Sequence, residues 1–112
     1  MPNPTVVLNV VGLDQAALAH MPNLAALGPV TALQPVLPAV TCSAQATMLT
    51  GLSPAEHGVV GNGWYERDQA EVRFWKQSNH LVHGEKVWEA ARRRDPSVTT
   101  AKMFWWFNMH AD

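Results

Sequence analysis

The chain opens with a nearly continuous run of apolar and β-branched residues at 5–11, which ends at Gly12. An uninterrupted run of this kind is typical of a strand that is buried on both faces, as in a parallel sheet. Apolar residues at 30–36 predict a second extended segment, and the patterns at 71–75 and 98–104 predict two further strands.

Helical patterns lie between these segments. Two short helices are predicted at 14–20, which is rich in alanine, and at 22–28, which opens with a proline and closes with a glycine. A longer helix is predicted to start at residue 41 or 42 and to end near residue 50, and another is predicted at 85–94. The glycine-rich residues 57–65 predict a turning loop.

This alternation of strands and helices predicts an α/β fold with a mostly parallel sheet. Ligands of such sheets bind at the carboxyl ends of the strands. Residues 12–14 and Thr41 both fall where such ends are expected.

Composition narrows the class of protein. Hydrophobic residues make up 47% of the chain and charged residues only 15%, against about 25% in an ordinary globular domain, so disorder is not expected. The net charge of −1 gives no electrostatic reason to expect a nucleic-acid or membrane partner. The single cysteine cannot form an internal disulfide. No apolar run reaches the roughly 18 residues of a membrane span, and no basic stretch precedes the first apolar run, so a cytoplasmic protein is expected.

The distribution of charge also indicates how the chain is organised. Between Asp14 and Glu56 no residue is charged, apart from His20 when it is protonated. A free-standing domain of this size would expose much of such a segment to water. We therefore expect residues 1–112 to be the N-terminal segment of a single, longer catalytic domain, which needs the remainder of its own chain to complete the fold.

Thr41 stands where the longer central helix is predicted to begin. A helix N-terminus favours bound phosphate and an alkoxide over an alcohol, so Thr41 is either a helix cap or a nucleophile. A threonine nucleophile needs a base or a metal ion to lower its pKa. Cys42 is a rival nucleophile, because a helix N-terminus lowers the pKa of a thiol, although a small buried residue is the simpler interpretation.

Six short motifs occur in a fixed order along the chain. They are Val11-Gly12-Leu13, Met21-Pro22-Asn23-Leu24, Leu37-Pro38 three residues before Thr41, Thr50-Gly51-Leu52-Ser53-Pro54, Glu56-His57-Gly58-Val59 and Asn62-Gly63-Trp64-Tyr65. Through these motifs, residues 5–108 resemble the nucleotide pyrophosphatase/phosphodiesterase branch of the alkaline phosphatase superfamily. The resemblance implies an alkaline-phosphatase-like α/β/α sandwich, of which this chain is the N-terminal portion.

The resemblance also implies an activity. Members hydrolyse phosphodiester or pyrophosphate bonds through a phospho-threonine intermediate, with two divalent metal ions, usually zinc. Thr41 takes the place of the nucleophile and of one metal ligand. Asn62 and Trp64 are assigned to binding a small-molecule phosphoester or nucleotide substrate, and His57 to a structural role.

Two positions depart from the family pattern. Val11 stands where the family usually carries an aspartate metal ligand, and Asp14 or Asn9 is the nearest substitute, although an aspartate that opens a helix is also a common cap. Ala44 stands where the family often has an asparagine that assists the phosphate, and the adjacent Gln45 is the substitute. These departures motivate an alternative, a catalytically inactive family member that serves as a binding or assembly module. Because the remaining metal ligands of family members lie beyond residue 112, the fragment alone is expected to be inactive.

His80 and His83 are spaced three residues apart, which a helix could turn into a metal pair. Their surroundings resemble a loop, so the spacing is weak evidence for a metal site.

Overall fold

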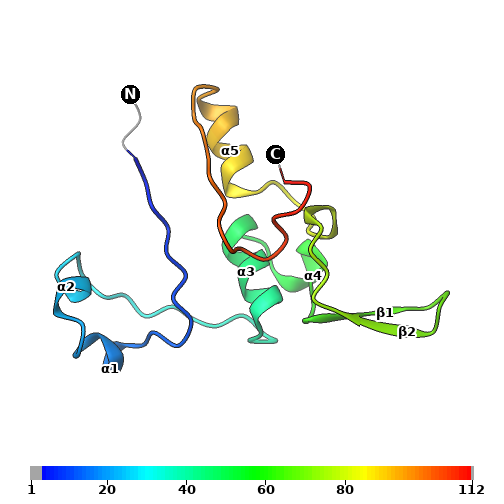
Figure 1. Cartoon of the computed structure of the whole chain (residues 1–112), viewed down its shortest axis with the longest axis horizontal. Coiled ribbons are helices and arrows are strands. Elements are labelled where there is room, and N and C mark those ends of the chain that lie inside the picture. Colours follow the sequence, from blue (N-terminus) through cyan, green and yellow to red (C-terminus); the bar gives the residue numbers. More distant parts are fainter. Residues whose placement is uncertain (1–3, 112) are drawn as a thin grey trace. The chain divides into compact units, whose positions relative to one another are not determined.

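A computed structural model describes residues 4–111 of the protein (Figure 1). The chain divides into two compact units, Met1–Gln34 and Pro35–Asp112. Each unit is described by itself below.

The first unit contains two one-turn helices, α1 (Gln15–Leu18) and α2 (Pro22–Ala25), which contact one another. Both predicted helices are confirmed, although each is shorter than expected. Asp14 caps α1, because its Oδ1 accepts a hydrogen bond of 2.7 Å from the Ala17 N–H. Pro22 occupies the first turn of α2, where the N–H that proline lacks would have no helical partner.

The strand predicted at 5–11 is not formed, and this prediction is wrong for the described residues. Its side chains are exposed, with Val6 at 78% and Val11 at 87% of full exposure. A strand of a parallel sheet requires a neighbouring strand, and no strand within residues 4–111 lies beside this segment. The segments 30–36 and 98–104 likewise form no strand in the described chain, because no other strand lies beside them.

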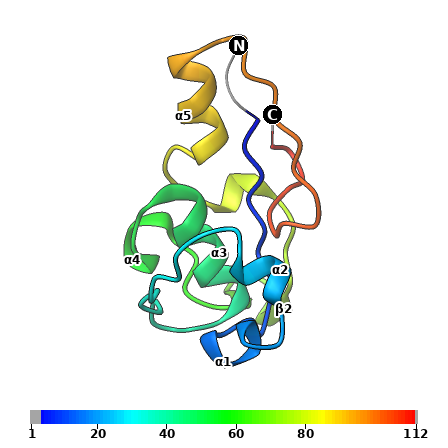
Figure 2. The ribbon, with the colours of Figure 1, turned by 90° about the vertical axis from the view of Figure 1, so that its left-hand side faces the viewer.

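The second unit contains the longer central helix, α3 (Thr41–Thr50), followed by α4 (Pro54–His57). Figure 2 shows α3 and α4 beside one another, and the two helices are in contact. The α3 helix ends at Gly51, whose φ of +71° is left-handed and whose N–H donates a 2.7 Å hydrogen bond to the Thr47 carbonyl. The glycine therefore ends the helix where the sequence predicts it.

The α4 helix is a single turn that the sequence pattern did not predict. It begins with a capping box, in which the Glu56 carboxylate accepts hydrogen bonds from the N–H and the hydroxyl of Ser53 at 2.8 and 2.7 Å.

The predicted C-terminal helix is confirmed as α5 (Val87–Arg94), which begins two residues later than expected. Its first turn is closed by Glu89, which accepts a 2.8 Å hydrogen bond from the Lys86 N–H. The three arginines at 92–94 occupy its last turn, where the helix dipole favours positive charge.

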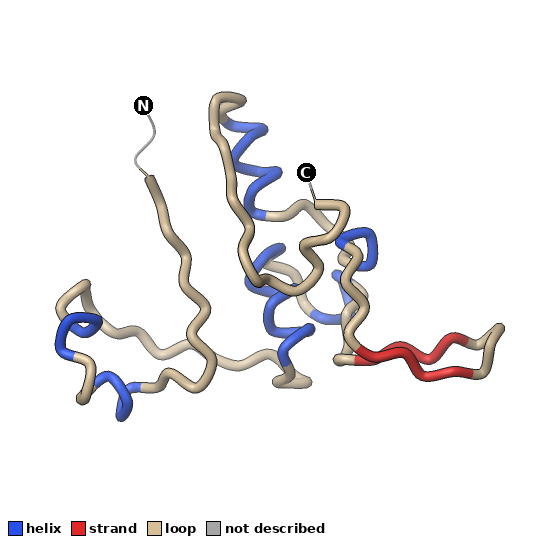
Figure 3. The backbone as a smooth tube through the Cα atoms, in the orientation of Figure 1, coloured by secondary structure: helices blue, strands red, loops and turns tan. Residues whose placement is uncertain are grey.

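The only sheet within residues 4–111 is an antiparallel hairpin of β1 (Gly63–Glu66) and β2 (Glu71–Phe74), drawn in red in Figure 3. The predicted short strand at 71–75 is confirmed, whereas the predicted loop at 57–65 extends only as far as β1. Gly63 pairs with Phe74, and a Cβ at Gly63 would lie 2.9 Å from the Phe74 ring, so a larger residue there would displace this exposed ring. The described chain is an α/β structure, and the mostly parallel sheet remains a prediction.

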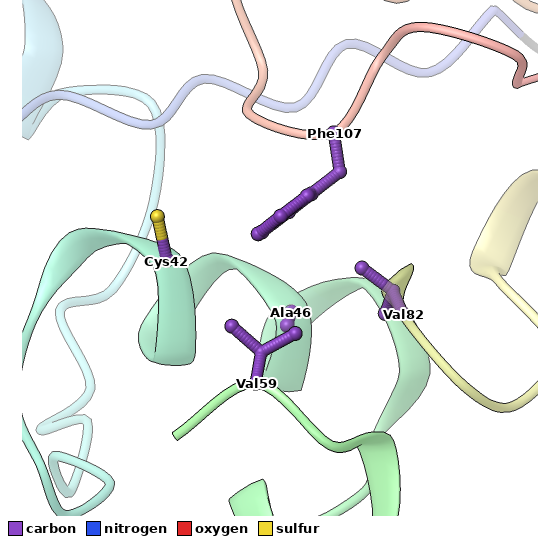
Figure 4. Packing of buried hydrophobic residues seen from close by; sticks show 5 residues of the cluster. All are labelled: Cys42, Ala46, Val59, Val82 and Phe107. Carbon is purple, nitrogen blue, oxygen red and sulfur yellow. The ribbon is translucent and has the colours of Figure 1, made fainter. Parts of the chain in front are cut away.

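The core of the second unit consists of five buried side chains from four segments (Figure 4). They are Cys42 and Ala46 of α3, Val59, Val82 and Phe107. The Phe107 ring points toward α3, and it has no exposed surface. Burying a phenylalanine of this kind contributes about 1.5–3 kcal/mol, so the segment around Phe107 is held firmly onto α3.

None of the helices in the described chain has the length and apolar character needed to cross a membrane.

Candidate active site

Thr41 is the first residue of α3, and Val40 is the residue that caps the helix. Because Val40 and not Thr41 holds the N-cap position, and the Val40 side chain makes no capping hydrogen bond, the capping interpretation of Thr41 is wrong. The Thr41 side chain is exposed, and its hydroxyl makes no hydrogen bond with any residue that the structure describes. The hydroxyl is therefore free to meet a ligand at the N-terminus of the helix.

Asn62 supplies the capping contact that Val40 cannot make. Its Oδ1 accepts a 3.0 Å hydrogen bond from the backbone N–H of Cys42, the residue after Thr41. The side-chain oxygen, and not the nitrogen, has to face this donor, because only the oxygen accepts. The Nδ2 group of Asn62 therefore keeps both of its N–H donors while the side chain is fixed beside the start of α3.

Two neighbours hold the loop that carries Asn62. The Trp75 N–H donates a 2.9 Å hydrogen bond to the Asn62 carbonyl, which joins the loop to the end of β2. Val59 is buried in the core three residues earlier. The position of the Asn62 amide is thus determined by the folded unit.

The buried side chain of His57 also holds this loop, through hydrogen bonds of both ring nitrogens. Its Nδ1 accepts a 3.1 Å hydrogen bond from the Val59 N–H, so the ring proton is on Nε2, which faces the Thr47 hydroxyl at 3.0 Å. Burial lowers the pKa of His57 from its ordinary value, because the charged imidazolium is poorly solvated there. His57 is therefore a neutral structural residue that links α3 to the Asn62 loop, in agreement with what the family resemblance implies.

Cys42 has no exposed surface and packs among the core side chains. Burial raises the pKa of its thiol to about 11. At neutral pH the thiol is protonated and inaccessible, so the structure does not support Cys42 as the nucleophile.

Gln45 is buried one turn along the same helix, and its Oε1 accepts a 2.7 Å hydrogen bond from the Trp106 N–H. This contact fastens the C-terminal segment to α3. The oxygen is thereby occupied by a structural contact, and substrate binding by Gln45 stays a prediction.

Trp64 is half-buried at the start of β1, two residues after Asn62. Its ring meets Phe107 edge-to-face at 6.0 Å, and the Lys76 ammonium lies 6.0 Å from the ring centre. The indole is thus anchored to the core at one side, and the Lys76 amine is paired with Glu66.

Asp14 lies in the first unit, where its carboxylate caps α1. The capping interpretation is confirmed by this hydrogen bond, and a role as metal ligand stays a prediction. Among residues 4–111 there is no cluster of three or more histidine, cysteine, aspartate or glutamate side chains that would hold a metal ion.

Sequence reasoning assigned Asn62 to substrate binding but missed its contact with the Cys42 N–H. No local pattern predicts this bond, because the two residues are 20 positions apart. The Thr47–His57 hydrogen bond was also missed, because it joins two residues that are 10 positions apart.

A family model described as type I phosphodiesterase / nucleotide pyrophosphatase matches residues 5–112. No curated protein and no solved structure matches the chain.

Proposed function

Because the chain belongs to the type I phosphodiesterase / nucleotide pyrophosphatase family, we propose that it takes part in hydrolysis of a phosphodiester or pyrophosphate bond, with Thr41 as the nucleophile. The observation that carries the proposal is the exposed Thr41 hydroxyl, which no described residue engages, next to the fixed amide of Asn62. The substrate class is a small phosphoester or a nucleotide.

The proposed reaction has two steps. In the first, Thr41 Oγ1 forms a bond to phosphorus, the bond from phosphorus to the leaving-group oxygen breaks, and the proton given up by the Thr41 hydroxyl is passed, directly or through water, to that oxygen. In the second, water attacks the phospho-threonine, phosphate or a phosphomonoester leaves, and the Thr41 hydroxyl is restored. The α3 N-terminus favours the negative charge that develops in both steps.

Asn62 is suited to stabilising that charge. Its Oδ1 is held by the Cys42 N–H at 3.0 Å, so the side-chain amide is fixed at the start of α3, one residue from Thr41. A donor that is fixed before the reaction needs no reorganisation when the oxyanion forms. Trp64 follows two residues later on β1 and is proposed to contact the substrate.

The family implies divalent metal ions, and the described residues do not form a site for them by themselves. Within residues 4–111 no three-donor cluster is present, and Thr41 and Asp14 are the two side chains for which a ligand role is proposed. Two divalent ions, such as zinc, would need further ligands besides Thr41 and Asp14. The 112-residue chain alone is expected not to turn over substrate.

A second function is favoured by one observation. Val11 occupies the position of the family aspartate, and the nearest carboxylate, Asp14, is committed to the cap of α1. A family member without that ligand would keep the fold and act as a binding or assembly module.

The test is a zinc-supplemented assay of the full-length protein on aryl phosphate diesters and monoesters. Thr41→Ala is expected to lower kcat by at least about 10³-fold, and Asn62→Ala by about 10²–10³-fold, the usual effect of one oxyanion donor. Cys42→Ala, which alters the adjacent side chain, is the matched control and is expected to stay active.

Activity that survives Thr41→Ala but is lost in Cys42→Ala would overturn the assignment of the nucleophile. A folded parent that binds phosphoesters without turnover would instead favour the binding module.

A further inference from the structure

The loop of Asn62 is tied to α3 by a second route, which runs through two tryptophans. The Trp75 N–H donates a 2.9 Å hydrogen bond to the Asn62 carbonyl. The Trp75 ring meets the Trp106 ring edge-to-face, with ring centres 5.0 Å apart and ring planes inclined by 65°. The backbone N–H of Trp106 in turn donates a 2.7 Å hydrogen bond to Gln45 Oε1 on α3. Because Asn62 Oδ1 also binds the start of α3, these contacts form a closed chain that begins and ends on one helix. We name Trp75 and Trp106 the tryptophan pair.

The Trp106 side of this chain of contacts is anchored in the core. Trp106 is partly buried and packs against the core side chains. Phe107, the next residue, is fully buried, and its ring points toward α3 (Figure 4). The Phe107 carbonyl accepts a 3.1 Å hydrogen bond from Nδ2 of Asn79, a buried residue of the short 3₁₀ helix η1 (Asn79–Leu81). Trp106 therefore gives Trp75 a fixed surface to pack against.

Trp75 has a backbone conformation that is unfavourable for a tryptophan. Its φ is +59°, in the left-handed region, where a bulky side chain is strained. Such a conformation persists only when the surrounding structure outweighs its cost. The Trp75 carbonyl accepts a 3.2 Å hydrogen bond from Gln77 Nε2 two residues along, whereas the ring contact with Trp106 connects Trp75 to α3. Since φ is the rotation about the bond from the backbone nitrogen to Cα, relaxation of φ would turn the Trp75 N–H away from Asn62.

We propose that the tryptophan pair positions the Asn62 amide beside Thr41. The ring contact holds Trp75 in its left-handed conformation, and this conformation aims the Trp75 N–H at the Asn62 carbonyl. The loop held in this way keeps Asn62 Oδ1 on the Cys42 N–H. Trp75 and Trp106 are thus positioning residues and need not touch the substrate. Their effect on hydrolysis rests on the function proposed above, whereas their effect on the position of Asn62 does not.

The backbone N–H of Cys42 reports on the position of Asn62. The first N–H groups of a helix have no acceptor within the helix, and the Cys42 N–H donates instead to Asn62 Oδ1. The Ala44 N–H, two residues later, donates to the Val40 carbonyl at 2.9 Å, a bond of the helix itself. Exchange of the Cys42 N–H with deuterium therefore follows the Asn62 contact, and exchange of the Ala44 N–H follows the folding of α3.

The test is hydrogen exchange at single-residue resolution in the full-length protein. Asn62→Ala is the reference for loss of the contact and is expected to speed exchange of the Cys42 N–H about tenfold, the upper range for one hydrogen bond. Trp75→Ala is expected to speed it about three- to tenfold, the range for one aromatic pair, without a change at the Ala44 N–H. Trp75→Phe, which keeps an aromatic ring, is expected to retain most of the protection. Tyr65→Ala is the matched control and is expected to change neither rate, because it removes a 63% exposed ring from the same hairpin, outside the tryptophan pair.

Unchanged exchange at Cys42 in Trp75→Ala would overturn the proposal, because the amide would then keep its position without the ring. Equal acceleration at Cys42 and Ala44 would also overturn it, since Trp75 would then stabilise α3 as a whole and not the Asn62 contact. No acceleration in Asn62→Ala would show that the Asn62–Cys42 bond is absent in solution, and the proposal would fail with it.

Kinetics of the same full-length variants on aryl phosphate diesters extend the test to hydrolysis. Trp75→Ala is expected to lower kcat about three- to tenfold with little change in KM, because a displaced donor is missed mainly when charge develops in the transition state. In combination with Asn62→Ala it is expected to cause no further loss, because both changes act on one amide. A further loss in the double variant would show that Trp75 does not act through Asn62. Full activity in Asn62→Ala would refute the role proposed for Asn62 in hydrolysis, and the exchange rates would still decide whether the tryptophan pair holds its amide.

Discussion

The imidazole of His57 has no exposed surface, and the hydrogen bonds to Thr47 and Val59 engage both of its ring nitrogens. Its pKa is lowered in the folded protein from the ordinary 6.5, chiefly because burial disfavours the charged ring. As the pH falls through 6.5, the unfolded chain takes up a proton that the folded protein does not. The contribution of His57 to the free energy of unfolding is therefore greatest above about pH 6.5, and it declines as the pH is lowered toward the pKa of the folded state.

We expect His57 to lower the free energy of unfolding of the parent chain by up to about 1.4 kcal/mol between pH 7.5 and pH 5.5. This limit is the free energy that corresponds to one pH unit, the interval from the unfolded pKa of 6.5 down to pH 5.5. Urea unfolding at a series of pH values measures this. His57→Gln is expected to be less stable at pH 7.5 but to lose this part of the pH dependence. His83→Gln, which changes an exposed histidine nearby, is expected to keep it. Parallel pH dependence in the parent and in His57→Gln would contradict the expectation.

At the scale of the element, the end of α3 depends on the backbone of Gly51. Its φ is +71°, and a Cβ built there would meet nothing within 4 Å. A substitution is therefore resisted by backbone conformation and not by packing. We expect Gly51→Ala to lower the free energy of unfolding by about 1–2 kcal/mol, and Gly51→Asn by less, because asparagine tolerates the left-handed region.

Gly28→Ala is the control for this prediction, since Gly28 also has open space around its Cα but no left-handed φ. Its unfolding free energy is expected to stay within about 0.5 kcal/mol of the parent. Denaturant titration of the three variants separates the two effects, and equal losses at Gly28 and Gly51 would disprove the conformational explanation.

The elements also show how far local patterns predict the structure. The end of α3 was predictable, because Gly51 and Pro54 restrict the backbone locally and independently of distant residues. The segment 5–11 was not, because an apolar β-branched run becomes a strand only beside a partner, and the described chain provides none. The candidate site divides in the same way. Thr41 is found by its place at a helix start, whereas the Asn62–Cys42 contact depends on a loop that folds back across 20 residues.

At the scale of the whole molecule, large apolar side chains remain exposed in both units. In the first unit they are concentrated along the extended run at 5–11, and in the second unit Phe104 is 90% exposed. Contiguous apolar surface of this kind is uncommon on soluble monomers and marks a surface that packs against something else. We propose that in a complete catalytic domain the remainder of the chain covers this run.

The 112-residue chain by itself is therefore expected to bind the dye ANS and to self-associate as its concentration rises. Size-exclusion chromatography with light scattering measures the association, and ANS fluorescence measures the accessible apolar surface. Val6→Lys with Leu8→Lys, at positions 78% and 70% exposed, is expected to reduce both signals, because charge disfavours burial of the run. Val72→Lys on the hairpin, 59% exposed, is the matched control.

If the control reduces association as strongly as the double variant, the hairpin and not the N-terminal run is the contact surface. A parent chain that stays monomeric and dye-free at all concentrations would show that these side chains are accommodated within the units, and the covering role proposed for the remainder of the domain would then lose its support.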